Sequence, residues 1–188
     1  VADEDMLPLK PQSLDCVVAN LSLHWVNDLP GALAQIRMAL KPDGVFLAAV
    51  MGGDSLHELR ESLMEAETAV RGGVSPRVSP LIDMQDMSAL MQRAGFALPV
   101  VDRDTISVDY ASPFRLMHDL RGMGAGNALA TRPPALSRDV LMRAAAHFAD
   151  ATDPDGRTAE QMALIYLSGW KPDASQAAPA PVAAARAP

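Results

Sequence analysis

The stretch Leu14–Val50 reads LDCVVANLSLHWVNDLPGALAQIRMALKPDGVFLAAV and contains two apolar runs with a helical pattern between them. The runs Leu14–Asn20 and Val45–Met51 are typical of parallel strands that are covered on both faces of a sheet. Asp28 is a suitable N-terminal cap for the intervening helix, and Lys-Pro-Asp-Gly at residues 41–44 is a typical helix stop and turn. The order strand, helix, strand predicts an α/β fold.

The rest of the chain continues this alternation. The pattern predicts helices that begin at Asp54 or Ser55, at Asp83 or Asp86 and twice within residues 112–150, and strands at residues 98–110 and 163–170. Residues 112–150 are therefore expected to form a helical insertion before the last strand. Residues 1–171 are expected to form a single domain, and the Ala/Pro-rich tail at residues 172–188 is expected to be disordered.

Composition excludes several classes of protein. The chain has 188 residues and a net charge of −7, and its basic residues are scattered, so the sequence does not predict a nucleic-acid partner. No apolar run reaches the ~18–20 residues needed to span a bilayer. The single cysteine, Cys16, lies in an apolar strand pattern, which favours a small buried side chain over a nucleophile.

The segment Asn20–Trp25 follows the first predicted strand directly. Ligands of open α/β sheets bind outside the carboxyl ends of the strands, so this segment is a candidate binding site. The imidazole of His24 could orient or deprotonate an acceptor there, and Trp25 could contact a substrate. The alternative is that both rings pack against the following helix.

Other polar positions leave two interpretations open. Gly52 and Gly53 end the second strand and either let a ligand approach the backbone or form an ordinary turn. Arg71 and Arg77 lie in a loop rich in Gly, Pro and Ser, which is either a solvated mobile loop or a lid that holds an anion. No spacing of His, Cys or acidic residues predicts a metal site.

Several segments resemble a known family: NLSLHWVNDLPGAL (20–33), GGDSLHELRESLMEAE (52–67), SPRVSPLIDMQDMSALMQRAGF (75–96), LRGMGAGNA (120–128) and IYLSGWKP (165–172). They are similar to class I S-adenosylmethionine-dependent methyltransferases, in the branch of the mitochondrial complex I assembly factor with a methyltransferase fold and its bacterial relatives. The resemblance implies the C-terminal part of a Rossmann-like fold, strands four to seven. The last strand would lie antiparallel between the fifth and sixth. The family's Gly-rich loop has no counterpart in the sequence.

The resemblance also implies functional residues. Asp3 and Glu4 match the acidic positions that accept a hydrogen bond from the adenine of S-adenosylmethionine. Asn20 and Leu21 match the backbone beside the methionine part of the cofactor. His24 and Trp25 would then face the substrate as catalytic residues.

The resemblance implies action on a protein, such as a respiratory complex I subunit, by methylation or arginine hydroxylation. Two alternatives are a non-catalytic assembly scaffold and an O-methyltransferase that acts on a malonyl carrier protein in biotin synthesis. The strand at Leu14–Asn20 would be left as an apolar sheet edge, which predicts poor solubility, a homodimer through that edge, or pairing with a further N-terminal segment. Because the Gly-rich loop has no counterpart, the chain alone is expected to be inactive. The expected location is the bacterial cytoplasm, or the mitochondrial matrix in a eukaryote.

Overall fold

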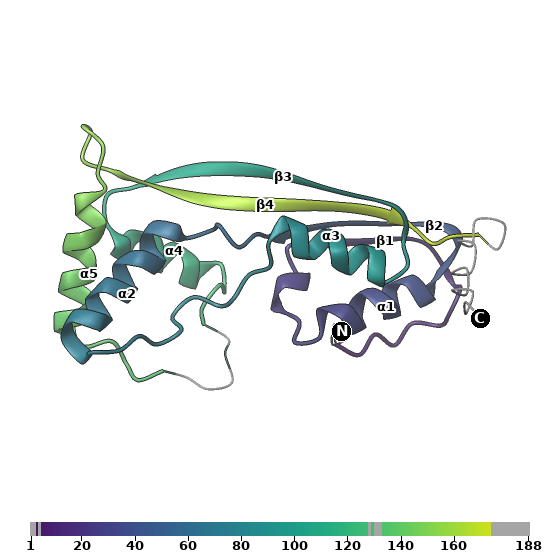
Figure 1. Ribbon diagram of the computed structural model, residues 1–188, viewed down its shortest axis with the longest axis horizontal. Coiled ribbons are helices and arrows are strands. Elements are labelled where there is room, and N and C mark those ends of the chain that lie inside the picture. Colours follow the sequence, from purple (N-terminus) through teal and green to yellow (C-terminus); the bar gives the residue numbers. More distant parts are fainter. Residues whose placement is uncertain (1–2, 4, 128, 130–132, 174–188) are drawn as a thin grey trace, which may run out of the picture. The chain divides into compact units, whose positions relative to one another are not determined.

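Figure 1 shows a computed structural model of the chain, which describes residues 3, 5–127, 129 and 133–173. In chain order, the elements are β1 (Leu14–Asn20), the short 3-10 helix η1 (Leu23–Trp25), α1 (Leu29–Ala39), β2 (Leu40–Met51), α2 (His57–Arg71), α3 (Met84–Arg93), β3 (Ala97–Tyr110), α4 (Pro113–Gly122), α5 (Arg138–Asp150) and β4 (Thr158–Trp170). The predicted α/β class is confirmed, and α4 and α5 occupy the predicted helical insertion. The Ala/Pro-rich tail lies outside the described residues from residue 174 onward.

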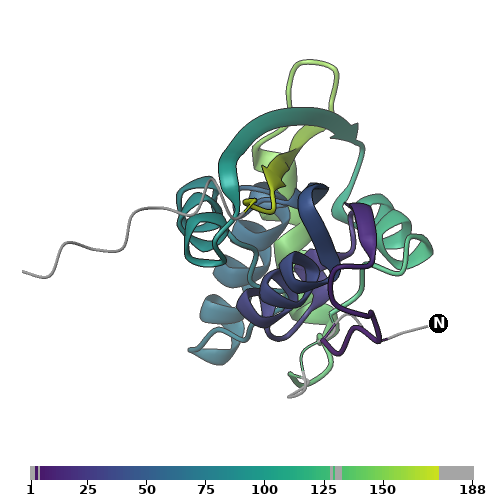
Figure 2. The same ribbon diagram turned by 90° about the vertical axis from the view of Figure 1, so that its right-hand side faces the viewer.

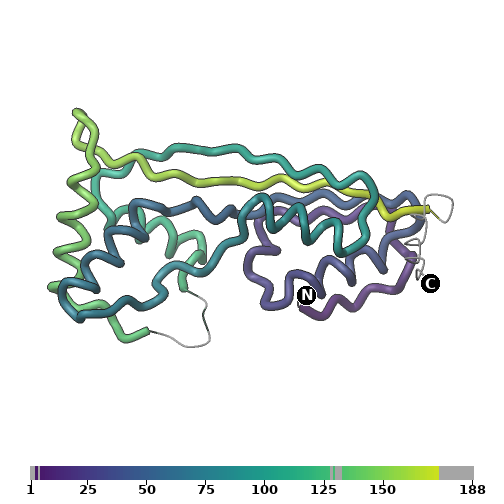
Figure 3. The backbone as a smooth tube through the Cα atoms, viewed as in Figure 1, coloured from purple at the N-terminus to yellow at the C-terminus, as the bar shows by residue number. Residues whose placement is uncertain are grey.

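The four strands hydrogen-bond in the order β1-β2-β4-β3, so the last strand lies between the two that precede it. Figure 3 traces β4 beside β3 along the sheet. Lys171 N–H donates to the carbonyl of Gly44, and Gly52 N–H donates to that of Ala163. Residue numbers thus rise along β2 while they fall along its neighbour, so β4 is antiparallel to β2. The predicted place and direction of the last strand are confirmed.

Strand and helix ends differ from the prediction in several places. Residues 41–44 do not form a turn, because β2 already begins at Leu40; the Asp43 N–H donates to the Lys171 carbonyl at 3.0 Å, and φ of Asp43 is +58°. This local distortion lets the Pro-Asp-Gly sequence remain inside a strand. The last strand begins at Thr158, five residues before its predicted start. Neither Asp54 nor Ser55 caps α2, since the cap residue is Leu56, whose side chain offers no acceptor.

The strands are not covered on both faces as expected. Along β2 the side chains alternate, with Phe46 and Val50 fully buried and Leu47 between them 42% exposed. Strand β1 lies at the edge of the sheet, where Val18 is 67% exposed. The prediction that Cys16 is buried is wrong, because this edge strand leaves its thiol exposed.

The chain divides into two compact units. Unit 1 lies within residues 1–48, 87–101 and 167–188, and unit 2 within residues 49–86 and 102–166. In unit 1, α1 and α3 lie on the same side of the strands (Figure 2). Phe46 of β2 stacks on Phe96 with ring centroids 5.3 Å apart.

Unit 2 contains α2, α4 and α5, which pack together through one apolar cluster (Figure 1). The fully buried residues at its centre include Leu116, Val140, Ala144 and Phe148. Ser137 caps α5 by accepting a hydrogen bond from the Val140 N–H, as the sequence predicts for a serine at that position. The helical insertion is therefore a folded part of unit 2. No helix in the described residues is long and apolar enough to cross a membrane.

Candidate functional site

Asp5 joins the acidic N-terminal segment to the loop that follows η1. Its Oδ1 accepts hydrogen bonds from the backbone N–H of Asn27 at 3.0 Å and of Asp28 at 3.1 Å, and its Oδ2 accepts one from Asn27 Nδ2 at 2.8 Å. The Asp28 amide, followed by the side-chain amide of Asn27, holds the pKa of Asp5 below its usual value. The acidic segment and the loop after β1 are thereby fixed against each other within unit 1.

Gln35 of α1 makes a second attachment. Its Oε1 accepts a hydrogen bond from Leu7 N–H, and its Nε2 donates to the Asp5 carbonyl, both at 2.9 Å. Asp28 caps α1, as the sequence predicts, by accepting from Gly31 N–H at 2.9 Å. The acidic segment therefore lies at the N-terminal end of α1.

Of the two acidic residues predicted to meet the adenine, Glu4 lies outside the described residues. Asp3 is exposed, and its Oδ1 accepts a hydrogen bond from Asp5 N–H at 3.0 Å. Because the Asp5 carboxylate is occupied by Asn27 and Asp28, Asp3 is the carboxylate that remains accessible to a ligand among the described residues of this segment.

Asn20 ends β1 as predicted and is exposed. Leu21 follows with φ of +53°, a left-handed conformation that is costly for a branched residue. Backbone strain of this kind is often found at functional sites. At Leu21 it accompanies the turn of the chain from β1 into η1.

His24 and Trp25 lie on η1, with ring centroids 4.8 Å apart and planes tilted by 45°. The Nδ1 atom of His24 is buried and has no hydrogen-bond partner within the described part of the chain. Burial lowers the pKa of His24, so its imidazole is neutral at physiological pH. Trp25 is 40% exposed and so presents an aromatic surface to solvent. The structure thus attaches the acidic segment to the loop that directly follows the imidazole and the indole of η1 in unit 1.

The glycines after β2 have a packing role in unit 2. A Cβ on Gly52 would lie 3.1 Å from the side chain of Ile165 and 3.3 Å from that of Ala163. Arg60 Nη2 donates to the carbonyls of Gly53 and Ser55 and holds the turn. An added Cβ would therefore require Ile165 to shift, which gives Gly52 a packing role against β4.

The two arginines of the 71–80 loop bind one buried carboxylate. Glu67, on α2, is fully buried; it accepts hydrogen bonds from Arg77 Nη2 at 2.5 Å, from Arg71 Nη1 at 3.2 Å and from Ser75 N–H at 2.9 Å. Burial acts to raise the pKa of Glu67, but the Arg77 hydrogen bond and the other contacts outweigh it and lower the pKa. The expectation of a solvated mobile loop is wrong for these side chains, since that of Arg77 is only 12% exposed.

Sequence reasoning missed Asp5, Gln35, Glu67 and Glu160 as organising residues. Glu67 and Glu160 are buried acids, but the sequence pattern of their helix and strand shows only that a polar residue stands at each position. Their partners lie up to about a hundred residues away in sequence. The sole available signal was a charged residue in register with the apolar stripe of α2, as for Glu67. No group of three or more acidic, His or Cys residues in the described ranges could hold a metal ion.

Comparison with known proteins identifies the fold. Residues 1–48 match the family model described as "Methyltransferase domain". A Bacillus halodurans protein, whose name assigns it provisionally to the methyltransferases, superimposes with a TM-score of 0.58 at 11% identity, over 92% of this chain and 76% of that one. Human "Arginine-hydroxylase NDUFAF5, mitochondrial" is 49% identical over 181 residues, 96% of this chain and 52% of the human protein. The chain thus has a methyltransferase-like fold and is similar in sequence to NDUFAF5.

The NDUFAF5 similarity extends to distant eukaryotes, with 40% identity to the Dictyostelium discoideum protein over 91% of this chain and 40% of that protein. A "Malonyl-[acyl-carrier protein] O-methyltransferase" of Methylovorus is 35% identical over 95% of this chain and 58% of its own length. The chain thus spans about half the length of the curated relatives it matches. The similarity to NDUFAF5 is higher than that to the carrier-protein enzyme.

Proposed function

We propose that the chain contributes one wall of an S-adenosylmethionine site and acts on a protein substrate, by arginine hydroxylation or methylation during respiratory complex I assembly. The single observation that supports this most is the attachment of the acidic segment, through Asp5, to the Asn27 and Asp28 amides, which directly follow the His24–Trp25 pair in the chain. The relationship to NDUFAF5 supports arginine as the target. The proposed location is the mitochondrial matrix in a eukaryote or the cytoplasm in a bacterium.

The residues present fit the cofactor in two respects. The exposed carboxylate of Asp3 can accept a hydrogen bond from the adenine amino group, and the backbone at Asn20 and the strained Leu21 can lie against the methionine part. The bound cofactor would supply a methyl group. The neutral imidazole of His24 would accept a hydrogen bond or a proton from the acceptor, and Trp25 would shield the site from water.

Amide chemical-shift mapping of the labelled chain tests the cofactor site. Adding S-adenosylmethionine should shift the amides of residues 5–9 and 20–25, and Asp3→Ala should reduce these shifts. The matched control is Glu65→Ala, which changes an exposed acid on α2. Shifts that spread over the whole chain, or that persist unchanged in Asp3→Ala, would contradict the proposed role of Asp3; the absence of any shift would contradict cofactor binding.

The target is tested by incubating the protein with S-adenosylmethionine and an arginine-containing peptide, in the presence of dioxygen and an added two-electron reductant, followed by mass spectrometry of the peptide. In the hydroxylation arm dioxygen is the oxidant: one oxygen atom enters a C–H bond of the arginine and the other leaves as water. Addition of oxygen supports hydroxylation, whereas addition of a methyl group supports methyl transfer. The similarity to malonyl carrier enzymes favours a second candidate, O-methylation of a malonyl thioester. Methylation of a malonyl carrier protein in the same assay, with no change in the arginine peptide, would favour this second function.

We also propose that two copies pair through β1. Because β1 lies at the edge of the described sheet, its outer backbone groups are available to a second strand. The exposed side chain of Val18 would add an apolar contact between the copies. Val18→Lys should convert a dimer into a monomer, as measured by light scattering. A monomeric wild-type protein would contradict the pairing.

A further inference from the structure

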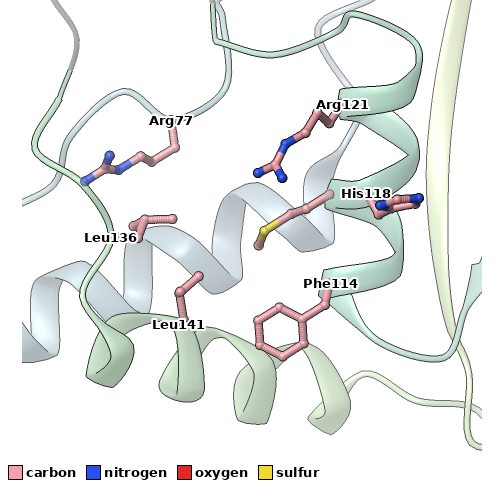
Figure 4. A pocket seen from close by; sticks show the side chains of 7 residues that line it. Arg77, Phe114, His118, Arg121, Leu136 and Leu141 are labelled. Atoms are coloured by element: carbon pink, nitrogen blue, oxygen red, sulfur yellow. The ribbon is translucent and has the colours of Figure 1, made fainter.

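An open groove of about 520 Å³ lies in unit 2 beside α4 and α5 (Figure 4). We call it the insertion groove. Its apolar lining comes from Phe114 and Met117 of α4, Leu141 of α5, and Leu136, which precedes α5. Figure 4 shows Leu136 and Leu141 directed toward the space across from Phe114. Phe114 is 44% exposed, so the groove offers solvent an aromatic surface that packing has not covered.

All the ionisable residues that line the insertion groove are basic: Arg77, His118 and Arg121. The charge of Arg77 is compensated by the buried carboxylate of Glu67. Arg121 is exposed, and its guanidinium forms no ion pair with any residue that the structure describes; Figure 4 shows it extending toward the groove. The groove therefore combines an apolar floor with an uncompensated cation at its rim.

The walls of the groove are held by specific hydrogen bonds. Arg71 bridges Glu67 and the carbonyl of Ala135, to which its Nη2 donates at 2.7 Å. Asn127 Nδ2 donates to the Pro76 carbonyl at 2.9 Å. These contacts tie the loop that carries Arg77 to the segment that carries Leu136, so the groove exists before any ligand arrives. Such preorganisation lowers the entropic cost of binding.

We propose that the insertion groove docks a short segment of a protein partner that carries an apolar side chain next to an acidic one. The apolar residue would lie on Phe114 and Leu141, and the acidic residue would pair with Arg121. This rests on the proposed action on a protein substrate and adds a contact surface to it. An arginine target would be repelled by the uncompensated charge of Arg121, so the groove fits a docking segment and not the residue that is modified.

Fluorescence polarisation with two labelled peptides tests the proposal. Both have the same length and the same Leu and Phe residues, and one carries Glu where the other carries Lys. The acidic peptide should bind the wild-type chain, and the affinity should fall as salt is raised. Because Arg121→Glu removes an attractive pair and adds a repulsive one, its Kd should rise about tenfold. The Lys peptide should bind Arg121→Glu more tightly than it binds the wild type.

Arg143→Glu is the matched control, since Arg143 is exposed on α5 and does not line the groove. It should leave the Kd of the acidic peptide within about twofold, whereas Phe114→Ser should weaken binding in both salt conditions. Equal loss in Arg143→Glu and Arg121→Glu, unchanged binding in Arg121→Glu, or no binding of the acidic peptide would overturn the proposal. Octanoate that binds as tightly as the peptide would reassign the groove to a small carboxylate.

The proposed cofactor site and the proposed docking groove can be tested independently of each other. Arg121→Glu should retain the amide shifts caused by S-adenosylmethionine, because Arg121 belongs to unit 2 and the proposed cofactor residues belong to unit 1. Peptide binding without a cofactor response would contradict the proposed function alone. A cofactor response without peptide binding would contradict the docking groove alone.

Discussion

The carboxylate of Glu160, near the start of β4, accepts a hydrogen bond from the backbone N–H of Leu59 in the first turn of α2, at 2.9 Å. Its other oxygen accepts from Glu58 N–H at 3.3 Å. A helix begins with unsatisfied N–H groups, and the local cap residue, Leu56, has no acceptor for them. A residue about a hundred positions later therefore caps α2.

Glu160→Ala should destabilise the chain by about 1–3 kcal/mol, because it leaves two N–H groups at the start of α2 without their acceptor. Urea denaturation followed by circular dichroism measures the loss. Glu65→Ala, at an exposed position on α2 that faces no such donor, should change the free energy of unfolding by less than about 0.5 kcal/mol. Equal effects of the two substitutions would show that the cap is unimportant.

Glu160 should also make stability depend on pH. Burial raises the pKa of Glu160 above the usual value of 4.5, although the amides of Leu59 and Glu58 oppose this. The folded protein then holds the proton more tightly than the unfolded chain does. The contribution of Glu160 to stability is therefore fully present below pH 4.5 and is lost as the pH rises through the folded pKa. As the pH rises over this range, the melting temperature of the wild type should fall relative to that of Glu160→Gln. A rise relative to Glu160→Gln would refute the assignment.

Glu67→Ala should cost about 3 kcal/mol, because it removes the buried partner of Arg71 and Arg77. The substitution should also release the 71–80 loop, which limited proteolysis would detect as faster cleavage after Arg77. Glu65→Ala again provides the control on the same helix. Unchanged cleavage in Glu67→Ala would mean that the loop is held by other contacts.

The imidazole of His24 should titrate below its usual value of 6.5, since burial disfavours its charged form. Its contribution to stability is then present above pH 6.5 and is lost as the pH falls toward the folded pKa. An NMR titration of the folded chain, with the urea-denatured chain as reference, measures the difference. A folded pKa equal to or above that of the denatured chain would exclude a neutral His24 buried as described.

Gly169→Ala should destabilise the chain by about 1–3 kcal/mol through overpacking in unit 1. The added Cβ would lie 3.0 Å from Met91 Cε and 3.0 Å from Phe96 Cβ, and the latter atom cannot move without its backbone. Gly73→Ala is the control, since no atom lies within 4 Å of its added Cβ. Thermal denaturation of both variants distinguishes a packing effect from a general effect of replacing glycine.

The sequence predicted those features that depend on local patterns. Asp28 and Ser137 cap helices because their side chains reach N–H groups three residues later. The position of β4 was not a local inference but came from the family resemblance. His24 and Trp25 were candidates because they follow a predicted strand, whereas the attachment of the acidic segment to the loop after them depends on Asp5, a contact that no local pattern reveals.

Predictions failed where distant contacts outweigh local preference. Lys-Pro-Asp-Gly resembles a turn, yet pairing with Lys171 keeps it in β2. Apolar composition suggested a buried Cys16, but exposure depends on the neighbours of a strand, and β1 has a neighbour on one side only. Arg71 and Arg77 resembled residues of a solvated loop because their partner, Glu67, is recognisable only in three dimensions.

Because β4 lies between β2 and β3, the sheet can be completed only after the last strand has been synthesised. Both neighbours leave the ribosome before the strand that joins them, so their facing edges have unsatisfied backbone groups until residues 158–170 emerge. During that interval the nascent chain exposes two unpaired strand edges, to which chaperones and other chains can bind. A nascent chain that pauses before Thr158 is added would therefore have its helices formed and its sheet open, which makes the speed of translation through residues 158–170 a determinant of yield.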